Sequence, residues 1–220
     1  MKEEQEMKKR ILAGLLVLGV SAAGLAGCGQ APDANNGTVD TSPPASMQTD
    51  GILETSSVAE VIKYGYSIKD FEDGEVREEN IETILEAGAK APSARNLQPW
   101  KFTVVRNYEI ASSLVQDTPE GGVLIIVSAV TEPEVGSVPV FDAGLATQNM
   151  YITAQSLGLG VHIYGSPLDK INGEMREQLG IPEGHDAVTV LLIGHINTKV
   201  STIASASKRN ALTDMVNYVD

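Results

Sequence analysis

The strongest constraint on the fold is an apolar run over residues 122–130, whose sequence is GVLIIVSAV. A strand with one exposed face alternates apolar and polar residues, but this run is apolar at nearly every position. We therefore expect a strand that is buried on both faces of its sheet. Such a sheet must be covered on both sides, which predicts helices layered on a central sheet.

Helical and strand patterns alternate along the rest of this region. Residues 80–91 carry Ile81, Ile84, Leu85 and Gly88 on one helical face, and Pro92 ends the pattern. Further strands are expected at residues 101–105, 161–164 and 187–195, and further helices at residues 108–116, 142–157 and 170–179. The alternation predicts an α+β fold of three layers, α-β-α, with a mixed central sheet.

The helix expected to begin near Asp142 is apolar on two faces. One face carries Phe141, Leu145 and Ile152, and the other carries Ala143, Met150, Ala154 and Leu157. No Asp, Glu, Lys or Arg occurs from residue 143 to residue 168. We expect Asp142 to be the N-cap or a first-turn acid and Gly158 to be the C-cap. A helix that is apolar on most sides must be covered on most sides, either at the centre of the domain or against a second subunit.

The first 27 residues have the pattern of a signal peptide. Basic residues 8–10 precede an apolar run over residues 11–27, which is shorter than the roughly 20 residues of a membrane-spanning helix. The run leads into Leu-Ala-Gly-Cys, which resembles a bacterial lipobox, so we expect lipidated Cys28 to anchor an extracytoplasmic lipoprotein to the membrane. The alternative is a plain signal peptide followed by an incidental cysteine. Because residues 2–6 are mostly acidic, Met7 is an alternative start.

Composition divides the rest of the chain into a tether and a domain. Residues 28–54 are rich in Pro, Asn, Ser, Thr and Asp, which predicts a flexible tether, and residues 55–220 have the size of one domain. The net charge is -13, and residues 1–27 contribute four basic and three acidic side chains, so the remainder carries about -14. So acidic a surface repels nucleic acid, which predicts small-molecule partners and no nucleic acid. Cys28 is the only cysteine, so no disulfide is expected within the chain.

Several common catalytic motifs are absent from the sequence. It has no Gly-rich dinucleotide fingerprint, no P-loop and no pair of metal ligands at helical spacing. His162, His185 and His195 are scattered, and we expect structural roles for His162 and His195 in or at the end of apolar strands. Ser205 and Lys208 match the S-x-x-K motif of serine acyl enzymes, but the other two motifs of those enzymes are missing. An acyl enzyme built on Ser205 is therefore one alternative.

A polar segment separates the helix over residues 80–91 from the strand at residues 101–105. Pro92 and Pro99 bracket this segment and make it stiff. It contains Ser93, Arg95, Asn96 and Gln98, and Trp100, the only tryptophan, follows it. A rigid polar loop beside a buried strand is typical of a binding site.

Four segments of this domain resemble the FMN-dependent nitroreductase family. The family's first flavin-site segment, A-x-x-A-P-S-x-x-N-x-Q-P-W, is similar to EAGAKAPSARNLQPWKFTVV at residues 86–105. Its central helix, the next strand and the loop under the flavin ring are similar to FDAGLATQNMYITAQSLGLGVHIYGSP at residues 141–167. Its closing strand resembles VTVLLIGH at residues 188–195, and its basic C-terminal tail resembles SKRNALTDMV at residues 207–216.

The resemblance implies a nitroreductase-like fold, FMN as the cofactor, and a homodimer with flavin at the subunit interface. It implies that a small-molecule donor reduces the flavin, which then reduces a nitroaromatic, a quinone or a similar acceptor without a catalytic acid or base side chain. By the same resemblance, the cofactor-binding residues are Ser67, Lys69, Pro92, Ser93, Ala94, Arg95, Asn96, Tyr164, Gly165, Lys208 and Arg209. The alternative is a flavin- or small-molecule-binding lipoprotein of the same fold that catalyses no turnover.

Two of these residues have specific implied roles. Asn96 would donate to and accept from the ring edge, and Gly165 would let a backbone N–H approach flavin N5. The plainer alternatives are a polar turn capped by the side chain of Asn96 and an ordinary glycine at a strand exit. Trp100 is expected in the core or at the subunit interface.

The sequence departs from the family pattern where the FMN phosphate would bind. The family has an Arg-Arg-Ser-x-Arg-like run, and the matching stretch is YGYSIKDF at residues 64–71. Ser67 and Lys69 fit that run, whereas Gly65 and Tyr66 replace its two arginines, and Tyr66 is equally a packing residue. The remaining phosphate ligands are then Ser67, Lys69 and Arg209, with Lys208 and Arg95 as further candidates. We therefore expect the phosphate to be bound less tightly than by the full run.

Overall fold

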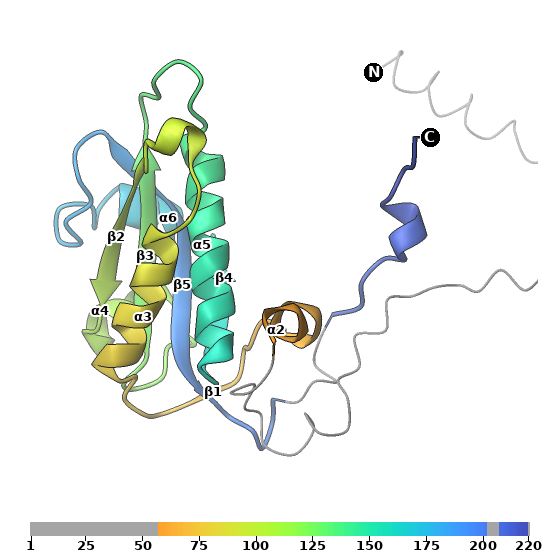
Figure 1. Ribbon diagram of the computed structural model, residues 1–220. Helices are drawn as coiled ribbons and strands as arrows, with labels where there is room; N and C mark the ends of the chain where they lie inside the picture. The colour runs from red at the N-terminus through yellow and green to blue at the C-terminus, as the bar shows by residue number, and fades with distance from the viewer. Residues whose placement is uncertain (1–56, 202–206, 220) are drawn as a thin grey trace, which may run out of the picture. The chain divides into compact units, whose positions relative to one another are not determined.

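The computed structural model describes residues 57–201 and 207–219. Cys28, the expected signal peptide and tether, and Ser205 lie outside the described residues. The elements, in chain order, are α2 (Val58–Tyr64), β1 (Phe71–Glu72), α3 (Glu78–Ala89), the 3₁₀ turn η2 (Ala94–Asn96), β2 (Trp100–Val105), α4 (Tyr108–Leu114), β3 (Val123–Val130), α5 (Pro139–Ser156), β4 (Gly160–Tyr164), α6 (Leu168–Asn172), β5 (His185–Ile196) and the 3₁₀ turn η4 (Leu212–Asp214) (Figure 1).

The sheet is built around β5, the longest strand. β3 and β4 flank β5, because Ile193 is paired with Val123 on one side and with Val161 on the other. β2 pairs with β3, and β1 pairs with the end of β5. Every pair between described strands is antiparallel, so the expected mixed character of the sheet is wrong for this part of the chain.

The lengths of the connecting helices explain the antiparallel pairing. α4 has 7 residues and rises about 10 Å, which is too short to return along β2, whose 6 residues extend about 20 Å. α6, with 5 residues, is likewise too short to return along β4. Only α5, with 18 residues, carries the chain back along the sheet, so β3 and β4 point the same way on either side of β5.

Helices cover both faces of the sheet, as the apolar run in β3 predicts. Val123, Ile125 and Val127 pack on the side of α3 and α5, and Leu124 and Ile126 pack on the side of α4 and α6. The side chains from Leu124 to Val127 are fully buried. The predicted three-layer arrangement is confirmed.

α5 has the two apolar faces that its sequence indicates. Ala143, Ala146, Met150 and Ala154 are fully buried against the sheet and α3, whereas Phe141 on another face is 64% exposed. The helix begins at Pro139, three residues before the expected start, because proline is well suited to a first turn. Asp142 is therefore a first-turn residue and not the N-cap, which is Val138.

Three other segments differ from expectation. The helix expected over residues 170–179 ends at Asn172, because Gly173 leaves the helical conformation and the Asn172 amide pairs with the backbone of Ala187. The helix expected to reach residue 116 ends at Leu114. The short α2 was not expected from apolar periodicity, although Ser57 and Glu60 form a capping box at its start. Within residues 57–201 and 207–219, no helix has the length and apolar character needed to cross a membrane.

Candidate functional site

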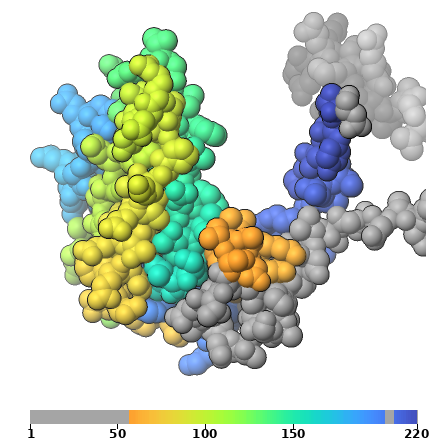
Figure 2. Space-filling model, viewed as in Figure 1, coloured from red at the N-terminus to blue at the C-terminus, as the bar shows by residue number. Residues whose placement is uncertain are grey.

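The predicted loop before β2 lies at one end of the sheet, and the predicted residues at the end of β4 lie at a different level. β2 begins at Trp100, opposite Ala129 of β3, which pairs with Asp186 near the start of β5, whereas β4 ends at Tyr164, opposite Val190, four residues further along β5. The loop over residues 92–99 therefore lies beside the loop over residues 131–138 that leads into α5. Figure 2 shows these two loops together, yellow-green and green, at one end of the molecule.

The loop over residues 92–99 holds an unusual backbone conformation. Arg95, Asn96 and Gln98 have φ of 54°, 59° and 48°, and no other non-glycine residue in the described part of the chain has positive φ. Such conformations destabilise a non-glycine residue by about 1–2 kcal/mol each. Strain concentrated in one polar loop is typical of a binding site, because it persists only where neighbouring structure holds it.

Hydrogen bonds hold this loop at both ends. The N–H of Ala94 donates to the carboxylate of Asp142 at 3.1 Å, and the N–H of Gln98 donates to the Ser93 hydroxyl at 3.0 Å. The amide of Gln98 donates to the Asn96 carbonyl at 3.2 Å. The carboxamide of Asn96 is exposed and makes no hydrogen bond within the described residues, so it does not cap its own turn. That carboxamide is available to a ligand.

Arg95 is directed toward the neighbouring loop. Its guanidinium donates to the carbonyl of Val135 at 2.9 Å and lies 3.9 Å from the carboxylate of Glu134. Both charged side chains are mostly exposed, so the ion pair itself contributes little. The contact nevertheless ties the two loops together, and it leaves Arg95 far from the other expected phosphate ligands.

Ser67 and Lys69 lie near the opposite end of α5. The hydroxyl of Ser67 is 3.0 Å from that of Tyr151, and Lys69 is exposed. Tyr151 follows Asp142, the contact of Ala94, by nine residues, which is about 13 Å along the helix axis. One chain therefore does not bring Ser67 together with the loop over residues 92–99.

Packing explains the glycine where the family pattern has an arginine. A Cβ on Gly65 would lie 2.1 Å from Oε1 of Gln155 and 2.5 Å from the carbonyl oxygen of Val61. Gln155 is buried, and its amide donates to the carbonyl of Tyr66 at 2.9 Å. A side chain at position 65 would displace this contact between α2 and α5.

The two predicted residues at the end of β4 differ in orientation. The ring of Tyr164 packs on the α4 and α6 side, and its hydroxyl donates to Asp117 at 3.3 Å. Burial, together with the nearby charge of Asp117 and this hydrogen bond, raises the pKa of Tyr164 to about 12. The side chain of Tyr164 is therefore engaged within the chain. A Cβ on Gly165 would meet no atom of the described residues within 4 Å, so packing among them does not require glycine there.

The remaining predicted site residues make few contacts within the described part of the chain. Lys208 and Arg209 are exposed, and Arg209 donates to the carbonyl of Ser207 at 2.9 Å. His162 and His195 contact the carbonyls of Ile68 and Glu75, as expected for structural histidines. Within the described residues, no three acidic, His or Cys side chains are grouped to hold a metal ion.

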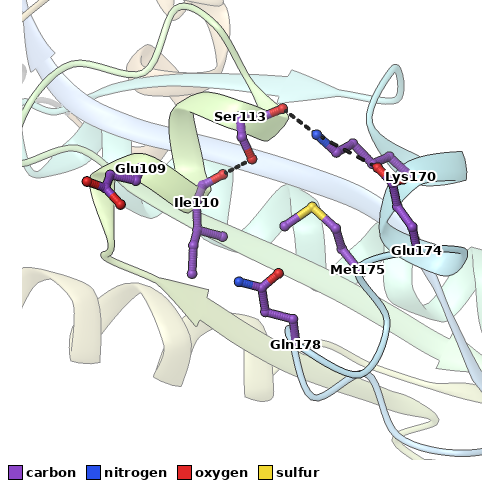
Figure 3. A pocket seen from close by; sticks show the side chains of 7 residues that line it. All are labelled: Glu109, Ile110, Ser113, Lys170, Glu174, Met175 and Gln178. Atoms are coloured by element: carbon purple, nitrogen blue, oxygen red, sulfur yellow. Dashed lines mark hydrogen bonds and ion pairs between the residues drawn. The ribbon is translucent and has the colours of Figure 1, made fainter.

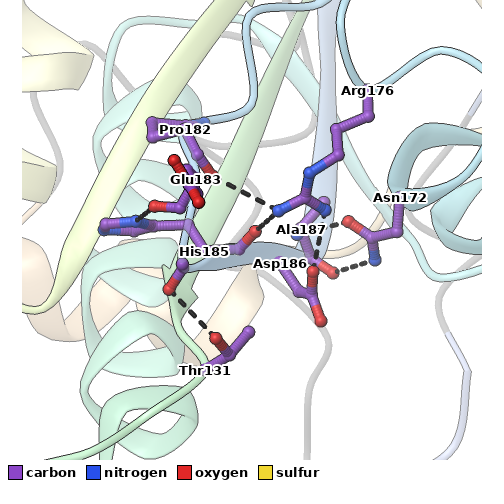
Figure 4. A network of polar contacts seen from close by, with 9 residues as sticks. Thr131, Asn172, Arg176, Pro182, Glu183, His185, Asp186 and Ala187 are labelled. Atoms are coloured by element: carbon purple, nitrogen blue, oxygen red, sulfur yellow. Dashed lines mark hydrogen bonds and ion pairs between the residues drawn. The ribbon is translucent and has the colours of Figure 1, made fainter.

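Sequence patterns did not indicate two further polar features. A pocket of about 430 Å³ between α4 and the turns after α6 is lined by Glu109, Ile110, Ser113, Lys170, Glu174, Met175 and Gln178 (Figure 3). The ammonium of Lys170 is already engaged there by the Ser113 carbonyl at 3.1 Å. Figure 4 shows Arg176 bound to Asp186 and to the carbonyls of Pro182 and His185, which fastens the turn before β5. Neither feature joins the predicted site residues.

Sequence reasoning missed the role of Asp142 as the anchor of the polar loop. It treated Asp142 only as a helix-start residue. The available signal was an isolated acid at the start of a long charge-free stretch.

The described residues define an α+β protein with a strained polar loop at one end of its sheet. A model of the Nitroreductase family matches residues 62–124 and 116–195, and the chain belongs to that family.

Individual relatives agree with this assignment. A protein of Methanothermobacter thermautotrophicus with the inferred name NADH dehydrogenase/NAD(P)H nitroreductase is 33% identical over 159 residues, which cover 68% of this chain and 83% of the relative. A protein of Archaeoglobus fulgidus with the same inferred name is 36% identical over 140 residues, covering 59% of this chain and 79% of the relative.

Solved structures share the fold. A nitroreductase with bound FMN from Bacteroides fragilis has a TM-score of 0.63 at 22% identity, covering 76% of this chain and 100% of that chain. An inferred nitroreductase in complex with FMN from Desulfovibrio desulfuricans has a TM-score of 0.62 at 26% identity, covering 75% of this chain and 98% of that chain. The predicted family and the predicted nitroreductase-like fold are confirmed, apart from the mixed character expected of the sheet.

Proposed function

We propose that this protein is an FMN-dependent oxidoreductase of the nitroreductase type. It passes electrons from a reduced small-molecule donor to a nitroaromatic, a quinone or a similar acceptor. The observation that carries the proposal is the strained loop over residues 92–99 with its available Asn96 carboxamide, in a chain whose family relatives are named nitroreductases. Similar structures that contain FMN support the choice of cofactor.

The residues present fit an isoalloxazine ring. The ring edge presents alternating donors and acceptors, and the Asn96 carboxamide offers both types of group. The open space around Gly165 lets a flat ring approach the backbone, where a Cβ would stand in the way. When bound, the flavin supplies the electron-transfer chemistry, and the protein supplies binding and orientation.

The phosphate would be held by Ser67, Lys69, Lys208 and Arg209. In one chain, the Ser67 corner is about 13 Å along α5 from the contact that holds the polar loop. Because the resemblance implies flavin at the subunit interface, we infer that each flavin is bound by residues of two chains, with the polar loop from one and the phosphate corner from the other. This makes the homodimer part of the site.

Exposed apolar side chains support a homodimer. On and before α5, Val138, Val140 and Phe141 are each more than half exposed. Gly144, one turn further along, has open space around its Cβ position, although glycine inside a helix destabilises it by about 0.5–1 kcal/mol. The close approach of a second chain would explain both features. A light-scattering mass of one chain at micromolar concentration would contradict this part of the proposal.

The proposal includes a lipid anchor, and its support is the lipobox pattern in the sequence. Lipidation of Cys28 would place the enzyme at the outer face of a membrane, on the expected tether. A donor other than cytoplasmic NAD(P)H would then be needed in the cell.

The alternative, a flavin-binding lipoprotein without turnover, is favoured by the two missing phosphate arginines. Measuring turnover distinguishes the oxidoreductase from the flavin-binding lipoprotein without turnover. The purified full-length protein in detergent is reduced chemically, and reoxidation of its flavin by a quinone and by a nitroaromatic is followed by absorbance. The proposed function predicts reoxidation by at least one of these acceptors well above the rate for free FMN. Bound flavin that neither acceptor reoxidises faster than free FMN would favour the alternative.

A further inference from the structure

Asp142 is the only buried charged residue among residues 57–201 and 207–219, and it is 1% exposed. Burial destabilises a charged group unless hydrogen bonds or dipoles compensate. Two features compensate for the burial of the Asp142 charge. The carboxylate accepts the N–H of Ala94 at 3.1 Å, and it lies in the first turn of the 18-residue α5, where the helix dipole favours negative charge.

The hydrogen bond between the Ala94 N–H and Asp142 lies immediately before the strained segment. Ala94 follows the extended Ser93 and immediately precedes Arg95, the first residue with positive φ. Without an outside contact, Arg95, Asn96 and Gln98 would relax toward ordinary backbone conformations. At its far end, the carbonyl of Pro99 accepts the N–H of Val130 at 3.1 Å, where the loop joins β2, and the other hydrogen bonds of the loop are internal or come from the mostly exposed Arg95 side chain. The Asp142 carboxylate is therefore the buried side-chain group that fixes the start of the loop to another element.

We propose that Asp142 is a positioning residue for cofactor binding, which holds the loop over residues 92–99 in the strained conformation that presents Asn96. This inference rests on the proposed function, since it takes the flavin ring as the ligand of the loop. Asp142 does not touch the ring. It acts through the Ala94 N–H, and its burial at the start of α5 keeps water from competing for that N–H.

The test combines three variants of the full-length protein with two readouts. Asp142→Ala removes the acceptor, Asp142→Asn keeps an acceptor oxygen without the charge, and Thr147→Ala is the matched control. Thr147 is also buried on α5, but its hydroxyl bonds only the carbonyl of Ala143 in its own helix. The first readout is the riboflavin dissociation constant, which reports the ring without the phosphate. The second is acrylamide quenching of Trp100, the only tryptophan, which is buried two residues beyond Gln98.

For Asp142→Ala, we expect riboflavin binding to weaken about tenfold or more, since a hydrogen bond to a charged group is lost. Trp100 should become more accessible to acrylamide in the flavin-free protein. Asp142→Asn should retain most of the affinity, and Thr147→Ala should leave both readouts unchanged. If Asp142→Ala leaves both readouts at wild-type values, or if Thr147→Ala changes them as much, Asp142 does not position the loop. If no variant, wild type included, binds any flavin, the proposed function is wrong, and Trp100 quenching alone then decides whether Asp142 holds the loop.

Discussion

The packing around Gly65 makes a quantitative prediction about stability. In Gly65→Ala, the new Cβ would start 2.1 Å from Oε1 of Gln155 and 2.5 Å from the carbonyl oxygen of Val61. The Gln155 side chain can rotate, but the carbonyl belongs to the last turn of α2, so the helix end must also move. The backbone of Gly65 has φ of -63°, which any residue can adopt, so the whole effect comes from the lack of space.

The expected magnitude follows from two contributions. Overpacking against buried groups destabilises by about 1–3 kcal/mol, and Val61 and Gln155, which the new Cβ would meet, are both buried although Gly65 itself is only partly so. The displaced Gln155 amide also loses its 2.9 Å hydrogen bond to the carbonyl of Tyr66, which contributes about 0.5–1.5 kcal/mol. A total of about 2–4 kcal/mol should lower the Tm of a domain of this size by roughly 4–16 °C.

The assay is thermal unfolding of the flavin-free protein, followed by circular dichroism. Gly165→Ala is the matched control, because a Cβ there would meet no atom within 4 Å in the part of the chain that the structure describes. Its Tm should stay within about 2 °C of wild type. Equal Tm values for Gly65→Ala and wild type would refute the steric explanation for the missing arginine.

Four further predictions concern the phosphate corner, the ring contact, pH and the anchor. Tyr66→Arg should tighten FMN about tenfold through a charge-assisted bond and leave riboflavin unchanged; equal gains for both flavins would place the phosphate elsewhere. Asn96→Ala should weaken flavin binding by about 1–3 kcal/mol, and an unchanged dissociation constant would make Asn96 a simple turn residue. Burial is the main cause that lowers the pKa of His162 below its ordinary value of 6.5. Its contribution to the free energy of unfolding is therefore complete above pH about 6.5 and is lost as the pH falls toward the folded-state pKa, because the unfolded chain takes up the proton first. In urea titrations, His162→Asn should show a flatter decline over this range, and slopes equal to wild type would contradict the assignment. Cys28→Ser should release the protein into the soluble fraction, and undiminished membrane retention would show a different anchor.

The sequence predicted the structure correctly where a local pattern of side chains is compatible with only one arrangement. The unbroken apolar run in β3 required cover on both faces, and the two-sided apolar pattern of α5 required burial on one face and left another exposed. Pro92 and Pro99 likewise marked a stiff loop before its conformation was known. These features depend on local patterning, which can be followed along a single chain.

The errors concern features that depend on distant contacts. The direction of the strands depends on whether each connecting helix is long enough to return along the sheet, and α4 and α6 proved shorter than their patterns suggested. The side of β4 that Tyr164 occupies, and the partner of Asp142, depend on residues far away in the sequence. The same holds for Gly65, because the side chain that leaves no room for a Cβ there belongs to Gln155, 90 positions later in the sequence.

The most direct test of the central claim is the flavin content of the purified full-length protein. Denaturation should release FMN, identified by chromatography and absorbance, and apo protein should take up FMN toward one molecule per chain. The account predicts a yellow protein whose flavin is lost in parallel with its folded structure. A colourless, folded protein that takes up neither FMN nor riboflavin at micromolar concentration would contradict it.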